Sequence, residues 1–259
     1  MGTIPMPEQS WQVDRLQVEF HADRSKLGAA AAQAVAARMK ETIALRDSVA
    51  MVFASAPSQN EFLASLAGID GIQWDKVIAF HMDEYLGLEA GAPQGFGTFL
   101  EENLYNAVSP GQTHFLDGQA EDPLAECRRY AELLATNPVD IVCAGIGENG
   151  HLAFNDPPVA DFNDTEQVKV VELDRACRMQ QVHDGCFPDF DSVPAQALTL
   201  TIPALTSARW IYTMVPGPTK AQAIKDTLTL PVSTRCPATV LRRHARAVLY
   251  IDRDSASRL

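Results

Sequence analysis

Residues 139 to 157 read Val139-Asp-Ile-Val-Cys-Ala-Gly-Ile-Gly-Glu-Asn-Gly-His-Leu-Ala-Phe-Asn-Asp-Pro157. The first six residues are mostly apolar and rich in β-branched side chains, as in a parallel strand buried on both faces. Three glycines then permit sharp turns of the backbone. Ligands bind at the carboxyl ends of strands in open α/β sheets. We therefore expect Asn149, His151 and Asp156 to project into a functional crevice.

A second strand-like stretch ends in two adjacent carboxylates. It reads Lys76-Val-Ile-Ala-Phe-His-Met-Asp-Glu-Tyr-Leu-Gly-Leu88, and the acids are Asp83 and Glu84. Neighbouring residues of an extended segment point in opposite directions, so only one of these carboxylates can face a ligand.

The rest of the chain alternates between strand and helix patterns. We predict strands at 15–20, 48–54, 77–80, 114–116, 139–144, 168–172, 208–215 and 247–251, and helices at 24–45, 60–67, 96–105, 123–134 and 220–227. Regular structure of unassigned type is expected at 197–202. This βαβ alternation predicts an α/β fold with a mostly parallel sheet, formed by a single domain over residues 1–259. Residues 1–13 are expected to be a loose leader. The segment of about 157–193, inserted beside the glycine-rich loop, is typical of a lid.

The amino-acid composition of the chain argues against several classes of protein. The chain has 259 residues, 46% of them hydrophobic, and a formal net charge of −12 without a long basic cluster, so nucleic acid is an unfavourable partner. No stretch approaches the ~20 apolar residues that span a bilayer, and no secretory signal is recognisable, so we expect a cytoplasmic protein. The five cysteines lack Cys-x-x-Cys spacing, which argues against a disulfide framework and a structural zinc site.

The two motifs together resemble those of glucosamine-6-phosphate deaminase. That family has Phe-x-Met-Asp-Glu-Tyr-x-Gly-Leu followed by Gly-x-Gly-x-[Asp/Asn]-Gly-His-x-[Ala/Gly]-Phe-Asn-Glu-Pro, in the same order and at about the same separation. The resemblance implies a Rossmann-like three-layer sandwich. It also implies amino-sugar catabolism, in which glucosamine 6-phosphate and water become fructose 6-phosphate and ammonia, without a metal or organic cofactor.

The resemblance assigns catalytic roles to four residues. Asp83 matches the base that moves a proton from C2 toward C1 of the sugar. His151 matches the residue that assists ring opening, for which imidazole suits because it titrates near neutral pH. Asn149 and Asp156 match the partners of this histidine. Asp156 stands where the family usually has glutamate, so either the backbone comes closer or a water bridges the gap.

The resemblance also suggests how the substrate is held. The family has a Thr-Gly-Gly-Thr-Pro phosphate loop where this chain has Ser55-Ala-Pro-Ser-Gln59, which keeps two hydroxyls but loses both glycines. Lys220 matches a phosphate-binding lysine. In the lid, Gln181 falls opposite a family arginine, which Arg178 or Arg175 could replace. The complete set of expected substrate- and phosphate-binding residues is Ser55, Ser58, Glu84, Gly147, Arg178, Gln181 and Lys220.

Several alternatives stay open at this stage. Galactosamine 6-phosphate differs from glucosamine 6-phosphate only at C4, which the sequence does not read. A 6-phosphogluconolactonase shares the fold but usually continues Ala-Ser-Leu-Phe-Pro after the histidine. A sugar-phosphate sensor without turnover is an alternative of another class. Family members range from monomers to hexamers, so a homo-oligomer is one option, and we expect no amino-sugar allostery through residues 157–169.

Overall fold

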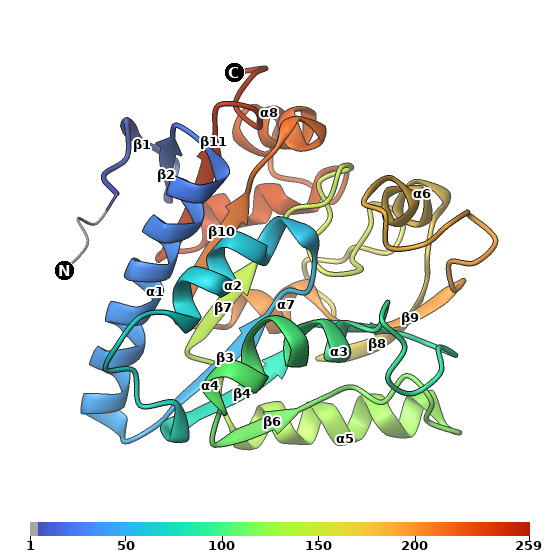
Figure 1. Cartoon of the computed structure of the whole chain (residues 1–259). Helices are drawn as coiled ribbons and strands as arrows, with labels where there is room; N and C mark the ends of the chain where they lie inside the picture. The colour runs from blue at the N-terminus through green and yellow to red at the C-terminus, as the bar shows by residue number, and fades with distance from the viewer. Residues whose placement is uncertain (1–4) are drawn as a thin grey trace.

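Two sheets organise residues 5–259, the part of the chain that the computed structural model describes (Figure 1). The main sheet has eight strands in the order β1-β2-β11-β10-β7-β3-β4-β6, and all of its pairings are parallel except the β1–β2 hairpin. Its strands are β1 (Gln9–Val13), β2 (Leu16–His21), β3 (Val49–Phe53), β4 (Val77–His81), β6 (Gln112–His114), β7 (Ile141–Ala144), β10 (Trp210–Val215) and β11 (Ala247–Asp252).

Helices cover both faces of the main sheet (Figure 1). One face is covered by α1 (Arg24–Arg46), α2 (Asn60–Ala67) and α3 (Phe96–Leu100) with the π-helical segment Glu101–Tyr105 and α4 (Asn106–Val108), and the other by α5 (Pro123–Thr136), α7 (Ile202–Thr206) and α8 (Ala221–Thr229). Side chains alternate between these faces: Met51 and Phe53 of β3 pack toward α1, and Val52 packs toward α5. The predicted three-layer α/β architecture is confirmed. No helix of residues 5–259 is both long and apolar enough to cross a membrane.

The N-terminal prediction needs correction. Residues 9–13 were expected in a loose leader, but they form β1, which pairs with β2 and places Trp11 and Val13 against the core. Their alternation of apolar and polar side chains is the strand pattern that the prediction missed. Residues 1–4 of the expected leader lie outside the described residues.

The segment 157–193 folds against the strand that carries Asp83. It contains β8 (Val168–Glu172) and α6 (Arg175–His183), and β8 joins β9 (Gln196–Leu200) and β5 (Asp83–Tyr85) in a small antiparallel sheet. A third apolar cluster, separate from the two faces of the main sheet, includes Tyr85, Phe154 and Phe187 and fills this region. The expected lid is therefore a packed substructure rather than a bare loop.

The order of the main sheet reverses between β3 and β7. From β3 the chain proceeds outward through β4 to β6, and from β7 it proceeds in the other direction through β10 to β11. Loops that leave such a switch point diverge and create a crevice at the carboxyl ends of the strands. The loops after β3, β4, β7 and β10 carry most of the site residues expected from the sequence.

Candidate active site

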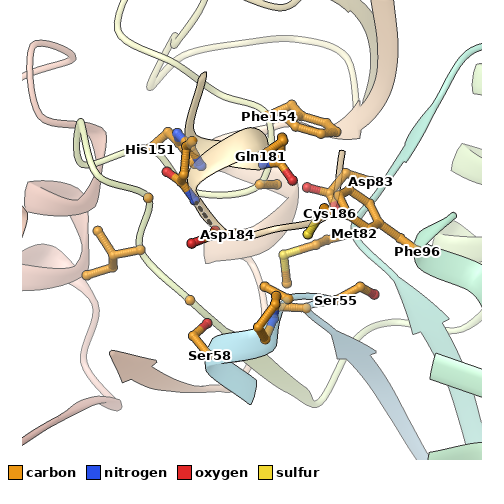
Figure 2. A pocket seen from close by; sticks show the side chains of 18 of the residues that line it. Ser55, Ser58, Met82, Asp83, Phe96, His151, Phe154, Gln181, Asp184 and Cys186 are labelled. Atoms are coloured by element: carbon orange, nitrogen blue, oxygen red, sulfur yellow. Dashed lines mark hydrogen bonds between the residues drawn. The ribbon is translucent and has the colours of Figure 1, made fainter. Parts of the chain in front are cut away.

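A pocket lies at this reversal of strand order, and we call it the switch-point pocket (Figure 2). Asp83 and His151 face it from opposite sides, and Ser55 and Ser58 form another part of its wall. The predicted residues that line it are Ser55, Ser58, Asp83, Gly147, His151, Gln181 and Lys220. Five segments far apart in the sequence thus meet in one cavity.

His151 lies with one ring nitrogen against two acceptors. Its Nδ1 is 2.9 Å from Oδ1 of Asn149 and 2.9 Å from Oδ1 of Asp156, while the Asn149 amide donates to the same Asp156 oxygen at 2.8 Å. The His151 backbone N–H also donates to Asn149 Oδ1, at 3.1 Å, which fixes the amide orientation. Amide and carboxylate oxygens only accept, so Nδ1 must carry the ring proton. Nε2 then keeps its lone pair and is the nitrogen that can take a proton from a ligand.

Asp156 reaches His151 directly although it is shorter than glutamate. Its carboxyl is 1% exposed. Burial by itself raises the pKa of Asp156, but the facing His151 and the hydrogen bonds from His151 and Asn149 together leave that pKa below its usual value. Asp156 is therefore an ionised, buried carboxylate that orients the imidazole.

Cys177 completes the buried group behind His151, a role that the sequence did not indicate. Its Sγ, a ring nitrogen of His151 and an oxygen of Asp156 lie within 4.8 Å of one another, which a cation could bridge. However, Nδ1 already carries a proton, and burial together with Asp156 raises the pKa of the Cys177 thiol. With two of three groups protonated, this set is suited to holding protons rather than a metal ion.

Asp83 and Glu84 diverge as predicted. Asp83 lines the switch-point pocket, whereas the Glu84 carboxylate accepts hydrogen bonds from the backbone N–H groups of Tyr85 (2.9 Å), Phe96 (3.1 Å) and Gly97 (2.9 Å). Glu84 is thus used to fix the start of α3. The structure does not bring it to the pocket, in contrast to its place among the expected substrate-binding residues.

The surroundings of Asp83 favour its protonated form. Burial raises the pKa of its carboxyl well above the usual value, and the nearby charges of Glu84 and Asp156 raise this pKa further. A carboxylate with a raised pKa holds an abstracted proton more firmly. This property suits a general base that works near neutral pH.

Lys220 supplies a buried cation at the beginning of α8. It is 5% exposed; burial lowers its pKa, and the charges of Asp184 and Glu148 oppose that change. Two hydroxyls share the pocket with it. Ser55 Oγ is buried without a hydrogen-bond partner among residues 5–259, and Ser58 Oγ accepts from the Gln59 amide at 3.1 Å. Both hydroxyls can donate to an anionic oxygen.

Arg178 does not reach the pocket. Its guanidinium donates to the carbonyls of Phe190 (2.9 Å) and Val193 (2.7 Å) and stacks on the Phe190 ring, 3.9 Å from the centroid. The expectation that Arg178 replaces the family arginine is therefore not met by this arrangement, because the guanidinium is engaged within the lid. Gln181 does line the pocket.

One face of the lid helix α6 was not recognised as a whole from the sequence. Positions 177, 180, 181 and 184 follow the i, i+3, i+4, i+7 spacing of one helix face, and all four approach the pocket or the group behind His151. Gln180 links the lid to the glycine-rich loop, because its Oε1 accepts from the Glu148 N–H at 2.8 Å. The helical period was the sequence signal that could have identified this face.

Comparison with known proteins agrees with this geometry. The family model described as Glucosamine-6-phosphate isomerases/6-phosphogluconolactonase matches residues 22–250. The chain belongs to this family. A glucosamine-6-phosphate deaminase from Lactobacillus delbrueckii subsp. bulgaricus is 34% identical over 188 residues, which cover 73% of this chain and 78% of the relative. A second, from Exiguobacterium sibiricum, is 34% identical over 190 residues, or 73% of each chain.

Solved structures of the family have the same fold. A monomeric glucosamine-6-phosphate deaminase superposes with a TM-score of 0.86 at 28% identity and covers 93% of this chain and 99% of its own. A 6-phosphogluconolactonase from Thermotoga maritima gives a TM-score of 0.73 at 18% identity, covering 91% and 98%. The second likeness shows the common fold alone.

The loop 55–59 departs from the family pattern but keeps two serines at the pocket. Pro57 begins a 3-10 turn, Pro57–Gln59, that continues into α2. Proline is well tolerated at the first position of a helical segment, where its missing N–H has no partner to lose. The departure from the family's two glycines therefore leaves the hydroxyls of Ser55 and Ser58 at the pocket.

One family glycine makes room for the histidine. A Cβ at Gly147 would come within 2.1 Å of Cε1 and 2.2 Å of Nε2 of His151. Gly147→Ala is therefore expected to displace the imidazole and lower kcat by about 10²-fold, the scale of a 1 Å misplacement in an active site. Gly68→Ala is the control, because its Cβ would meet nothing closer than 3.6 Å. Equal kcat for the two variants would contradict this role of Gly147.

Proposed function

We propose that this chain is a glucosamine-6-phosphate deaminase, which converts glucosamine 6-phosphate and water into fructose 6-phosphate and ammonia. Membership of the family and the deaminase relatives support this proposal. The observation that carries it is the pairing of Asp83, a buried carboxylate, with His151, an oriented imidazole, on opposite sides of one pocket that also contains a buried lysine.

Ring opening is assigned to His151. Its Nδ1 proton is engaged by Asn149 and Asp156, so Nε2 can accept the proton of the anomeric hydroxyl and return it to the ring oxygen. The Asp156 carboxylate compensates the transient positive charge on the imidazole ring of His151. Asn149 and Asp156 therefore act by orienting His151.

Isomerisation is assigned to Asp83. In the open-chain sugar its carboxylate removes the proton from C2 and delivers it to C1, after which water replaces the nitrogen and ammonia leaves. Each step moves a proton or exchanges water for ammonia, so the proposed reaction uses no metal and no organic cofactor.

The phosphate is assigned to the end of the pocket that contains Lys220. The ammonium and the hydroxyls of Ser55 and Ser58 can all donate to phosphate oxygens. Gln181 and Gly147 also line the pocket and are proposed to contact the sugar. Glu84 and Arg178 have no part in this assignment.

The remaining alternatives differ in support. The 6-phosphogluconolactonase likenesses at 18% identity and below show the fold alone, so we do not favour that activity. Galactosamine 6-phosphate stays the nearest rival substrate because it has the same reacting carbons. A sensor without turnover would have no need for a buried base opposite an oriented histidine. All five cysteines are free, which fits the proposed cytoplasmic location.

Ammonia release tests the proposal. Glucosamine 6-phosphate, galactosamine 6-phosphate, glucosamine and 6-phosphogluconolactone are offered in parallel, with ammonia and fructose 6-phosphate as readouts. Turnover of glucosamine 6-phosphate in preference to its C4 epimer is expected. Turnover of the lactone alone, or of nothing by a folded protein, would overturn the proposal.

Removal of the buried cation should weaken substrate binding. Lys220→Ala is expected to raise KM for glucosamine 6-phosphate at least about tenfold with a small change in kcat, because the phosphate is held equally in the ground and transition states. Steady-state kinetics provide the measurement. Lys225→Ala, on the exposed face of the same helix, is the matched control and should leave KM unchanged. An unchanged KM for Lys220→Ala would remove this lysine from the site.

A further inference from the structure

A carboxylate of the lid shares the pocket with the phosphate-binding lysine. Asp184 immediately follows α6, lines the switch-point pocket, and stands near its centre in Figure 2. Among the charged groups near Lys220, Asp184 opposes the effect of burial on the pKa of the ammonium more strongly than Glu148 does. The Lys220 ammonium, which is proposed to bind the phosphate, is therefore already under the influence of the negative charge of Asp184.

The stability of α6 does not explain why an aspartate stands at position 184. Asp184 is the C-cap of a nine-residue helix, and the negative end of the helix dipole disfavours a carboxylate there. The Gln180 amide donates to Asp184 Oδ2 at 3.2 Å, and Gln180 in turn accepts from the N–H of Glu148. Two hydrogen bonds in series thus hold the Asp184 carboxylate in the pocket from the glycine-rich loop.

Apart from Lys220, no lining residue of the pocket in the described part of the chain has an ammonium or guanidinium group that would offset the charge of a phosphate. Its lining includes Lys220 as the ammonium and Asp83 and Asp184 as carboxyls, and no arginine is among the lining residues in the described part of the chain. A phosphate dianion that approaches Lys220 therefore meets repulsion from Asp184, and this repulsion is strong where solvent is partly excluded.

We propose that Asp184 is a specificity-determining residue of the pocket: it keeps a negative charge in the pocket that also contains Lys220, and this charge repels the phosphate of the substrate. This inference rests on the proposed function, because it concerns the same phosphate end of the site. The consequence is a pocket that binds phosphate esters more weakly than Lys220 and its hydroxyls alone would allow.

Asp184→Asn tests the charge while keeping the shape of the side chain and an acceptor for Gln180. Titration calorimetry with inorganic phosphate and with fructose 6-phosphate should show about five- to tenfold tighter binding to this variant than to the unaltered protein. Fructose, which lacks the phosphate, should show no such difference. The difference should shrink as ionic strength rises, because the Asp184 carboxyl is partly exposed.

Asp191→Asn is the matched control, because it removes the same charge from an exposed position of the same lid segment. It should bind both probes like the unaltered protein. Asp184→Ser is the second variant should asparagine disturb folding, which thermal melting will reveal. Phosphate affinity that is unchanged or weaker in folded Asp184 variants, or equally increased by Asp191→Asn, would overturn the inference. Loss of the proposed function would appear separately, as no ammonia release by the unaltered protein.

Discussion

Replacing Asp83 with asparagine is expected to lower kcat by about 10³-fold, because the amide cannot accept the C2 proton. The side chain keeps its shape, so the Kd of fructose 6-phosphate should change less than about twofold. Steady-state ammonia release and product titration measure the two effects separately. A parallel loss of binding and turnover would show instead that Asp83 shapes the pocket without acting as the base.

The raised pKa of Asp83 adds a pH signature. The carboxyl must be ionised to accept a proton, so kcat/KM should fall as the pH is lowered through a pKa that lies above the usual carboxyl range. The fall of kcat/KM on the acid side of the profile should therefore occur at a higher pH than it would with an aspartate of ordinary pKa. The residual activity of Asp83→Asn should lack this fall.

The same substitution should stabilise the fold. The pKa of Asp83 is higher in the folded state than its unfolded value of about 3.9, so stability is lost as the pH rises from that value through the folded-state pKa. Asparagine carries no charge and avoids this loss. Thermal melting should give a higher Tm for Asp83→Asn than for the unaltered protein, with a larger difference at pH 8 than at pH 4. A lower Tm at pH 8 would contradict the burial argument.

Truncation of His151 has the second largest expected effect. His151→Ala is expected to lower kcat by about 10²- to 10³-fold, because the pocket loses the base that assists ring opening. The Kd of fructose 6-phosphate should change little, since Lys220 and the two serine hydroxyls stay in place. Single-turnover ammonia release is the measurement that separates this chemical effect from slow product release.

A second histidine provides the control for that variant. His114 lies on β6 outside the switch-point pocket, so His114→Ala should keep kcat near that of the unaltered protein. Imidazole added to His151→Ala should restore part of the rate by entering the vacated space. An unchanged kcat for His151→Ala would reduce this residue to a structural support of the loop.

Much of the site was accessible from sequence because its residues follow buried strands. The apolar runs that end at Ala144 and near Met82 predicted parallel strands, and parallel strands place their carboxyl ends at one edge of a sheet. His151 and Asp83 could thus be assigned to a common crevice. The opposite directions of Asp83 and Glu84 also followed from strand geometry. Local periodicity is sufficient for such inferences because each depends on short-range backbone geometry.

The directions of the side chains in the lid were not predictable from the sequence. The prediction considered Arg178 for the pocket, but the helix turns that side chain toward the carbonyls of Phe190 and Val193. Cys177 was not among the residues expected at the site, and it lies with His151 and Asp156. A helix has several faces, and which one meets the pocket depends on how the helix docks on the small antiparallel sheet, an arrangement that local sequence does not encode.

By itself, the sequence determined the α/β fold, the family, and the loops that contain Asp83 and His151, because these follow from strand periodicity and from motifs of contiguous residues. Only the tertiary structure decided which nitrogen of His151 is free, that Asp156 touches the ring directly, and that Asp184 lies in one pocket with Lys220. Those facts depend on distances of a few ångströms between segments far apart in the chain, and packing of the whole molecule sets such distances.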